Sequence, residues 1–167
     1  LEFRRVLFRS VSKLDTAGNF VWARQIQSTV SSMVYIPCIT TDSSGSVYTA
    51  GAVLDSADFD PGPGTYYLAS TGQSDIVVSK LDSSGNFSWA LQMGSSGTGL
   101  SLGYSIDLDM VGNIYVAGVF QSTVDFDPGA GVFPMTAAAV DDIFTLKLRG
   151  GVNENTTAVG EIGRAHV

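Results

Sequence analysis

The chain has 167 residues, a formal net charge of −7 and 15% charged residues, with one cysteine and one histidine. A single cysteine excludes an internal disulfide, and the acidity argues against a nucleic-acid partner, because phosphate contacts need clustered Lys and Arg. No apolar run approaches the roughly 18 residues of a membrane-spanning helix, so we predict no membrane insertion.

The two ends of the chain share nothing with the rest of it. Residues 1–10 (LEFRRVLFRS) resemble a translated short-read sequencing adapter, and residues 161–167 (EIGRAHV) resemble the reverse complement of that adapter. A genuine basic N-terminus is the alternative, but two matching ends of one adapter argue against it. We therefore treat both segments as non-native and exclude them from the fold prediction.

Residues 11–160 carry five cations and fourteen anions, a net charge of −9. The histidine, His166, lies outside this segment. We therefore expect no Ser-His-Asp triad, no Cys-His pair and no histidine metal site within it.

Four short motifs predict four tight turns along the chain. Each reads Asp-x-x-Gly followed by Asn or Ser, at 15–19, 42–46, 82–86 and 109–113. Asp opens a turn through its side chain, and Gly accepts the positive φ needed where the chain reverses. Strand-type runs flank each turn, so we predict four hairpins, from 11–14 and 20–23, 35–40 and 47–50, 77–81 and 87–91, and 105–108 and 114–119.

The same elements recur after 67 residues. Trp22-Ala23 returns as Trp89-Ala90, and Ala50-Gly51 returns as Ala117-Gly118. A fixed period of this length predicts a repeat architecture in which each unit stacks on its neighbours. Two hairpins per period make four antiparallel strands per unit, and the strand at 114–118 is apolar on both faces, as expected for a strand covered on two sides.

These observations predict an all-β fold made of antiparallel four-stranded blades of a β-propeller. Tandem immunoglobulin-like sandwiches fit poorly, because each needs about seven strands and roughly 100 residues. A parallel β-helix would lack the hairpin turns. Residues 11–148 would hold an incomplete set of about two and a quarter blades. They divide into an outer half-blade at 11–27, a whole blade at 34–93 and three strands of another at 103–148.

A polar linker at 149–160 stands where the next outer strand is due. We expect the array to end here and the N-terminus of a longer parent protein to supply the missing strand. Without the missing blades, the chain would expose apolar faces and strand edges, so we expect it to self-associate.

The order of four segments resembles the bacterial SBBP-type β-propeller repeat. These segments are 75–82 (DIVVSKLD), 85–90 (GNFSWA), 112–118 (GNIYVAG) and 125–129 (DFDPG), and the similarity covers residues 11–148. The resemblance implies a propeller fold and an exported protein, extracellular or on the cell surface, and it implies no common reaction. The linker after the repeats also resembles the lead-in to a type IX secretion sorting domain.

The motif Asp58-Phe59-Asp60-Pro61-Gly62 and its copy at 125–129 are the strongest candidates for chemistry. Two carboxylates two residues apart could offer oxygens to Ca²⁺, although a calcium loop usually provides more. The alternative, which we favour, is a turn whose carboxylates accept backbone N–H bonds while the Phe packs inward.

Other notable residues favour structural roles. Trp22 and Trp89 could stack on sugars, but their shared place in an apolar strand favours core packing. Asp107 and Asp109 are spaced for acid and base work, yet the preceding repeat has Thr40 in place of Asp107, and Asp109 is a turn residue. Cys38 lies in an apolar run, so we expect a small buried residue and no reactive thiol.

We therefore predict a non-enzymatic scaffold or interaction module and assign no catalytic, cofactor-binding or metal-binding residue. Nearly every notable residue has a counterpart 67 positions away, whereas an active site needs one copy of its residues. A fragment of an extracellular polysaccharide-degrading enzyme, whose active site lies outside this piece, is one alternative. A calcium-stabilised adhesin is another. The expected partners are a protein or a glycan and the missing blades of the parent chain.

Overall fold

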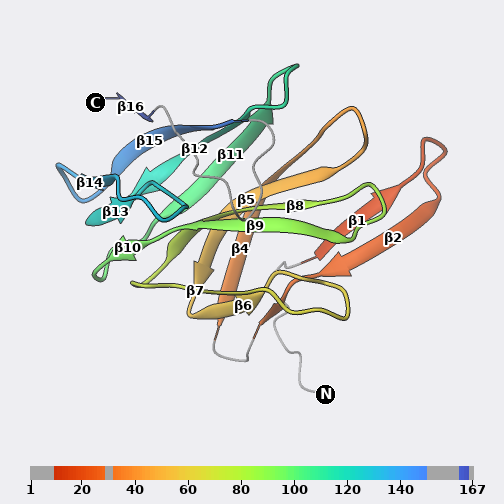
Figure 1. Cartoon of the computed structure of the whole chain (residues 1–167), viewed down its shortest axis with the longest axis horizontal. Helices are drawn as coiled ribbons and strands as arrows, with labels where there is room; N and C mark the ends of the chain where they lie inside the picture. The colour runs from red at the N-terminus through yellow and green to blue at the C-terminus, as the bar shows by residue number, and fades with distance from the viewer. Residues whose placement is uncertain (1–9, 29–31, 150–161, 166–167) are drawn as a thin grey trace.

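The computed structural model describes residues 10–28, 32–149 and 162–165, with side chains for the first two ranges. These residues form strands and turns without a helix, which confirms the predicted all-β fold (Figure 1). No helix in the described part of the chain could span a membrane. The predicted adapter-like residues 1–9 and the linker residues 150–160 lie outside it.

Three larger antiparallel sheets follow one another along the chain. Sheet 1 is a hairpin of β1 (Ser10–Leu14) and β2 (Phe20–Gln25). Sheet 2 has the order β4 (Met33–Thr41), β5 (Val47–Leu54), β8 (Asp75–Leu81) and β9 (Phe87–Met93). Sheet 3 has the order β11 (Leu102–Leu108), β12 (Ile114–Phe120), β15 (Asp142–Leu148) and β16 (Ile162–Ala165). The four predicted hairpins are confirmed.

The fourth strand of sheet 3 differs from the prediction. We expected three strands from 103–148, but β16 pairs with β15 and comes from the segment that we set aside as non-native. Its register joins Leu146 to Ile162 and Ile143 to Ala165. An unpaired strand edge presents free N–H and C=O groups, and any extended backbone can satisfy them regardless of its side chains.

Two small three-stranded sheets were not predicted from the sequence. One joins β3 (Gln27–Ser28), β6 (Ser56–Asp58) and β7 (Tyr67–Ala69). The other joins β10 (Ser95–Ser96), β13 (Thr123–Asp125) and β14 (Pro134–Thr136). Strands of two or three residues are too short to show an alternating pattern, so the 67-residue recurrence of β6 and β7 as β13 and β14 was their only sequence signal.

All four Asp-x-x-Gly turns have one geometry. In the first, the N–H groups of Ala17 and Asn19 donate to Oδ1 of Asp15 at 2.9 and 2.8 Å. The N–H of Gly18 donates to the Asp15 carbonyl, and Gly18 has a φ of 84°. The equivalent glycines at 45, 85 and 112 have φ values of 81°, 80° and 82°. The side chain of one Asp and the positive φ of one Gly therefore close each hairpin, as predicted.

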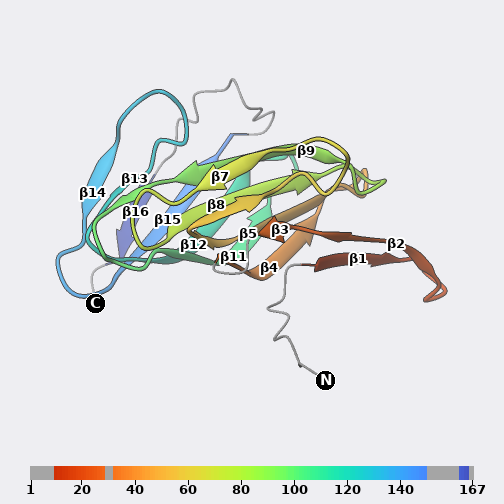
Figure 2. The same cartoon turned by 90° about the horizontal axis from the view of Figure 1, so that it is seen from below.

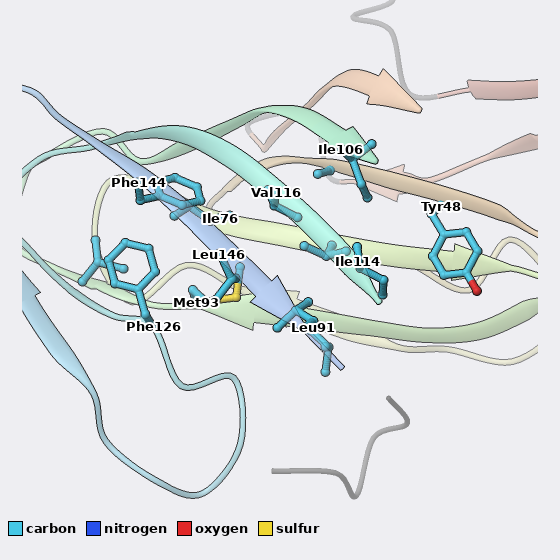
Figure 3. Close-up of a cluster of buried hydrophobic side chains, with 14 of the residues drawn as sticks. Tyr48, Ile76, Leu91, Met93, Ile106, Ile114, Val116, Phe126, Phe144 and Leu146 are labelled. Carbon is cyan, nitrogen blue, oxygen red and sulfur yellow. The ribbon is translucent and has the colours of Figure 1, made fainter. Parts of the chain in front are cut away.

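The three sheets pack in chain order, and each sheet has two faces. We call the face turned toward the preceding sheet the N-side face and the opposite one the C-side face. The C-side face of sheet 2 and the N-side face of sheet 3 share the largest core (Figure 3). That core includes Tyr48, Ile76, Leu91 and Met93 from sheet 2 and Ile106, Ile114, Val116, Phe144 and Leu146 from sheet 3.

Sheet 1 covers the other face of sheet 2. Trp22 of β2 packs in a small core with Val47 and Leu81, which lie on the N-side face of sheet 2. In Figures 1 and 2 the β1–β2 hairpin accordingly lies on the opposite side of sheet 2 from β12 and β15. Sheet 2 is therefore packed on both faces.

The prediction that strand 114–118 is covered on two sides is wrong for the described chain. Burial along β12 alternates, with Tyr115 and Ala117 only half-buried. Its counterpart β5 is buried at seven of its eight positions. The two strands have similar apolar sequences, so the difference arises from position, because β5 lies in the middle of the stack and β12 lies at its end.

Candidate functional site

The Asp58 loop uses its carboxylates to hold its own backbone. Oδ1 of Asp58 accepts hydrogen bonds from the N–H groups of Asp60 at 3.0 Å and Tyr66 at 2.7 Å. Oδ1 of Asp60 accepts from the N–H of Gly62 at 2.7 Å. Phe59 between them is 1% exposed. The favoured prediction of an Asp-capped turn with an inward Phe is confirmed here.

The copy of this loop repeats each contact 67 residues later. Oδ1 of Asp125 accepts from the N–H groups of Asp127 at 3.0 Å and Phe133 at 2.7 Å. Oδ1 of Asp127 accepts from the N–H of Gly129 at 2.8 Å, and Phe126 is buried. Among the residues with described side chains, no three His, Cys, Asp or Glu gather as a metal site. These bonds explain the motif without a metal.

A second polar cluster was missed by sequence reasoning and surrounds Asp75, which is fully buried. Its carboxylate accepts from the N–H and Oγ1 of Thr71, from Nε2 of Gln92 at 2.6 Å, and from the N–H and Oγ of Ser95. A buried carboxylate without a cation is stable only with such a full set of donors. Because these donors are up to 20 residues away, no local pattern could have revealed the cluster.

Two open grooves lie beside the small sheets, and each has a repeat-equivalent glutamine in its lining. One groove, of about 440 Å³, is lined by Thr71, Gln92, Gly94, Ser96, Thr123, Asp125, Asp127 and Pro134. The other, of about 400 Å³, is lined by Ala23, Arg24, Gln25, Gln27, Ser28 and Pro61. Gln25 and Gln92 are repeat equivalents. Amide and hydroxyl groups line both grooves, with two carboxylates in the first and the Arg24 guanidinium in the second, which suits a ligand bound through hydrogen bonds.

The two tryptophans are core residues, as predicted. Trp22 and Trp89 are each 6% exposed. The Trp89 ring meets Tyr48 edge-on, with the centroids 6.1 Å apart, and the indole N–H of Trp22 donates to the Ser83 carbonyl at 3.2 Å. Neither ring presents a free face on which a sugar could stack.

The pair Asp107 and Asp109 does not form an acid–base site in this geometry. Oδ1 of Asp109 accepts from the N–H groups of Val111 and Asn113, and Oδ2 accepts from the Asn113 side chain at 2.7 Å. The Asn113 side-chain bond leads the effects that lower the pKa of Asp109. A carboxylate held ionised inside a turn is a poor proton donor at neutral pH.

Cys38 is half-buried, and its Sγ donates to the Ala50 carbonyl at 3.2 Å. Burial raises the pKa of this thiol. Because the thiolate is the reactive form, the raised pKa agrees with the prediction that Cys38 is not a reactive thiol. The residue is less buried than we expected, because β4 lies at the edge of sheet 2.

Comparison with known proteins adds no further assignment, since no protein-family model matches the chain and no curated protein matches it significantly.

Proposed function

We propose that the chain is a non-enzymatic interaction module, formed by a segment of β-propeller from a secreted or cell-surface bacterial protein. One observation carries the proposal: the carboxylates most suggestive of chemistry occur in repeated pairs and make the same structural hydrogen bonds in both copies. An active site would need one set of unengaged acids. Four-stranded antiparallel sheets that stack in chain order support the propeller arrangement.

The ligand that best fits the grooves is a glycan. Each groove is lined by amides and hydroxyls, which pair with sugar hydroxyls in either direction. The repeat-equivalent residues Gln25 and Gln92 line the two grooves, so one polymer with a repeating unit could contact both. Weak contacts at two linked sites add up to useful affinity when the ligand spans them.

The test is affinity electrophoresis of the full chain through gels that contain soluble polysaccharides, with a reducing-end assay on the same mixtures. We expect at least one polysaccharide to retard the chain without release of reducing ends. Ser96→Trp, which fills the larger groove, should weaken retardation. Ser88→Trp, at an exposed position outside both grooves, is the matched control and should not.

Three outcomes would count against the proposal. Release of reducing ends would favour the polysaccharide-degrading alternative. Equal retardation of the Ser96→Trp and Ser88→Trp variants would remove the groove as the binding site, and a panel without any retardation would remove the glycan as the ligand.

A further inference from the structure

The N-terminal end of the sheet stack exposes a face whose repeat equivalent is buried. On the N-side face of sheet 1, Leu14 is 57% exposed, whereas its equivalent Leu81 on sheet 2 is 7% exposed. Phe20 is 68% exposed, and its equivalent Phe87 packs against a core cluster. Four residues are identical between the two faces, namely Ser12, Leu14, Phe20 and Ala23 in sheet 1 and Ser79, Leu81, Phe87 and Ala90 in sheet 2.

The C-terminal end of the stack has the opposite face exposed. On the C-side face of sheet 3, Ile143 is 40% exposed and Thr145 is exposed, while Val119 is half-buried. The equivalents on sheet 2 are Ile76, Val78 and Ala52, which are at most 2% exposed because sheet 3 covers them. The same apolar pattern is therefore buried in the middle of the stack and open at its end.

The two internal interfaces show what covers such faces. At both, the C-side face of one sheet meets the N-side face of the next: Trp22 of sheet 1 packs on Leu81 of sheet 2, and Leu91 of sheet 2 packs in the same core as Leu146 of sheet 3. The open C-side face of sheet 3 and the open N-side face of sheet 1 are thus the two halves of an interface that the chain already makes twice.

We propose that these two open faces bind each other between copies of the chain, head to tail. The N-side residues Ser12, Leu14, Phe20 and Ala23 are uncharged. The opposite face carries Asp107 of β11 and Lys147 of β15 on its described strands, so no like charges meet. Contact between two different faces leaves a free half-site on each end of every oligomer. Assembly then continues until a ring closes or a filament grows.

The experiment is sedimentation velocity of the full chain over a concentration series, with one lysine variant on each face. We expect the unmodified chain to form larger species as concentration rises. Thr145→Lys blocks the C-side face and Phe20→Lys blocks the N-side face, so each variant alone should stay monomeric. An equimolar mixture of the two should form a dimer and nothing larger, because one intact half-site of each kind remains.

Val132→Lys is the control, since Val132 is 76% exposed and lies in the Asp125 loop away from both faces. This variant should assemble like the unmodified chain. All three substituted residues are exposed. Far-ultraviolet circular dichroism checks that each variant folds. Ile143→Lys and Leu14→Lys replace any variant that does not.

Three results would overturn the proposal. The unmodified chain could remain monomeric at every concentration. Phe20→Lys alone could still dimerise, which would indicate a symmetric contact between two C-side faces. The mixture of the two variants could stay monomeric, which would show that the faces do not recognise each other.

Discussion

Nε2 of Gln92 donates a 2.6 Å hydrogen bond to the carboxylate of Asp75 and a second, at 2.7 Å, to the carbonyl of Ala69. Gln92 therefore ties the outer strand of sheet 2 to both the neighbouring strand β8 and the small-sheet strand β7. Asp75 also collects donors from Thr71 and Ser95, so three segments meet at one buried charge. This junction connects sheet 2 to the small-sheet strands β7 and β10.

Asp75→Ala should lower the free energy of unfolding by at least about 3 kcal/mol, because it leaves several buried donors without an acceptor. Urea unfolding followed by tryptophan fluorescence measures the change. Asp142, the repeat equivalent, is the matched control, since it is partly exposed and accepts the N–H of Ala138 at 2.9 Å. Asp142→Ala should cost about 1 kcal/mol. Equal losses for the two variants would contradict the role given to the Asp75 cluster.

Acid should destabilise the fold through its turn aspartates. Burial raises the pKa of Asp42, but hydrogen bonds from Ser44, Ser46 and Tyr48 outweigh it and lower that pKa to about 2. A folded-state pKa below the unfolded value of about 3.9 means that the stabilisation is present above about pH 4 and is lost as the pH falls toward 2. Asp42→Asn should lower the free energy of unfolding by at most about 2 kcal/mol at neutral pH. The variant should also lose less stability than the unmodified chain between pH 4 and pH 2.

Melting temperatures between pH 7 and pH 2 test this prediction. Asp107→Asn is the control, because Asp107 is exposed and its Oδ1 accepts a hydrogen bond from the N–H of the adjacent Leu108 at 2.8 Å. If the melting temperature of Asp42→Asn fell with pH as steeply as that of the unmodified chain, the result would be inconsistent with the lowered pKa.

Calcium should not raise the melting temperature. The Oδ1 atoms of Asp58 and Asp60 already accept backbone N–H groups, and so do those of Asp125 and Asp127. Ca²⁺ prefers six to eight oxygen ligands, and these loops would have to break their own turns to supply them. Differential scanning calorimetry with added calcium or a chelator is the measurement. If calcium raised the melting temperature and Asp58→Asn abolished the rise, the result would favour the alternative of a calcium-stabilised adhesin.

Gly51 should tolerate no side chain, although it lies in a regular strand. A Cβ there would overlap the carbonyl oxygen of Tyr35 in the irregular stretch of β4, so Gly51→Ala should cost about 3 kcal/mol. Gly18→Ala is the comparison, since its Cβ would meet nothing within 4 Å and would suffer only from a φ of 84°. That variant should lower the free energy of unfolding by about 1 kcal/mol. Urea unfolding measures both losses, and a larger loss for Gly18→Ala than for Gly51→Ala would contradict this prediction.

Local chemistry made part of this fold predictable. The turns at Asp15, Asp42, Asp82 and Asp109 follow from one carboxylate and one glycine within five residues, and the flanking strands follow from their β-type runs. The Asp-Phe-Asp-Pro-Gly loops could likewise be interpreted as capped turns, because donors and acceptors lie within eight residues of one another.

The small sheets and the strand β16 were beyond such reasoning. β3, β6 and β7 are too short to carry a periodic signal, and β3 pairs with a strand about 30 residues away along the chain. β16 occupies an edge that the repeat pattern assigns to another strand, and backbone pairing alone places it there.

What the sequence by itself determined is the repeat unit, with its hairpins, its 67-residue period and its structural carboxylates, because each depends on contacts between near neighbours in the chain. Only the tertiary structure decided which copies are buried. Leu14 and Leu81 occupy equivalent positions in two copies of the same strand. Leu14 is largely exposed, whereas Leu81 is covered by Trp22. The physical reason is that burial depends on the sheet that packs above a residue, and two identical repeats at different places in a stack have different neighbours.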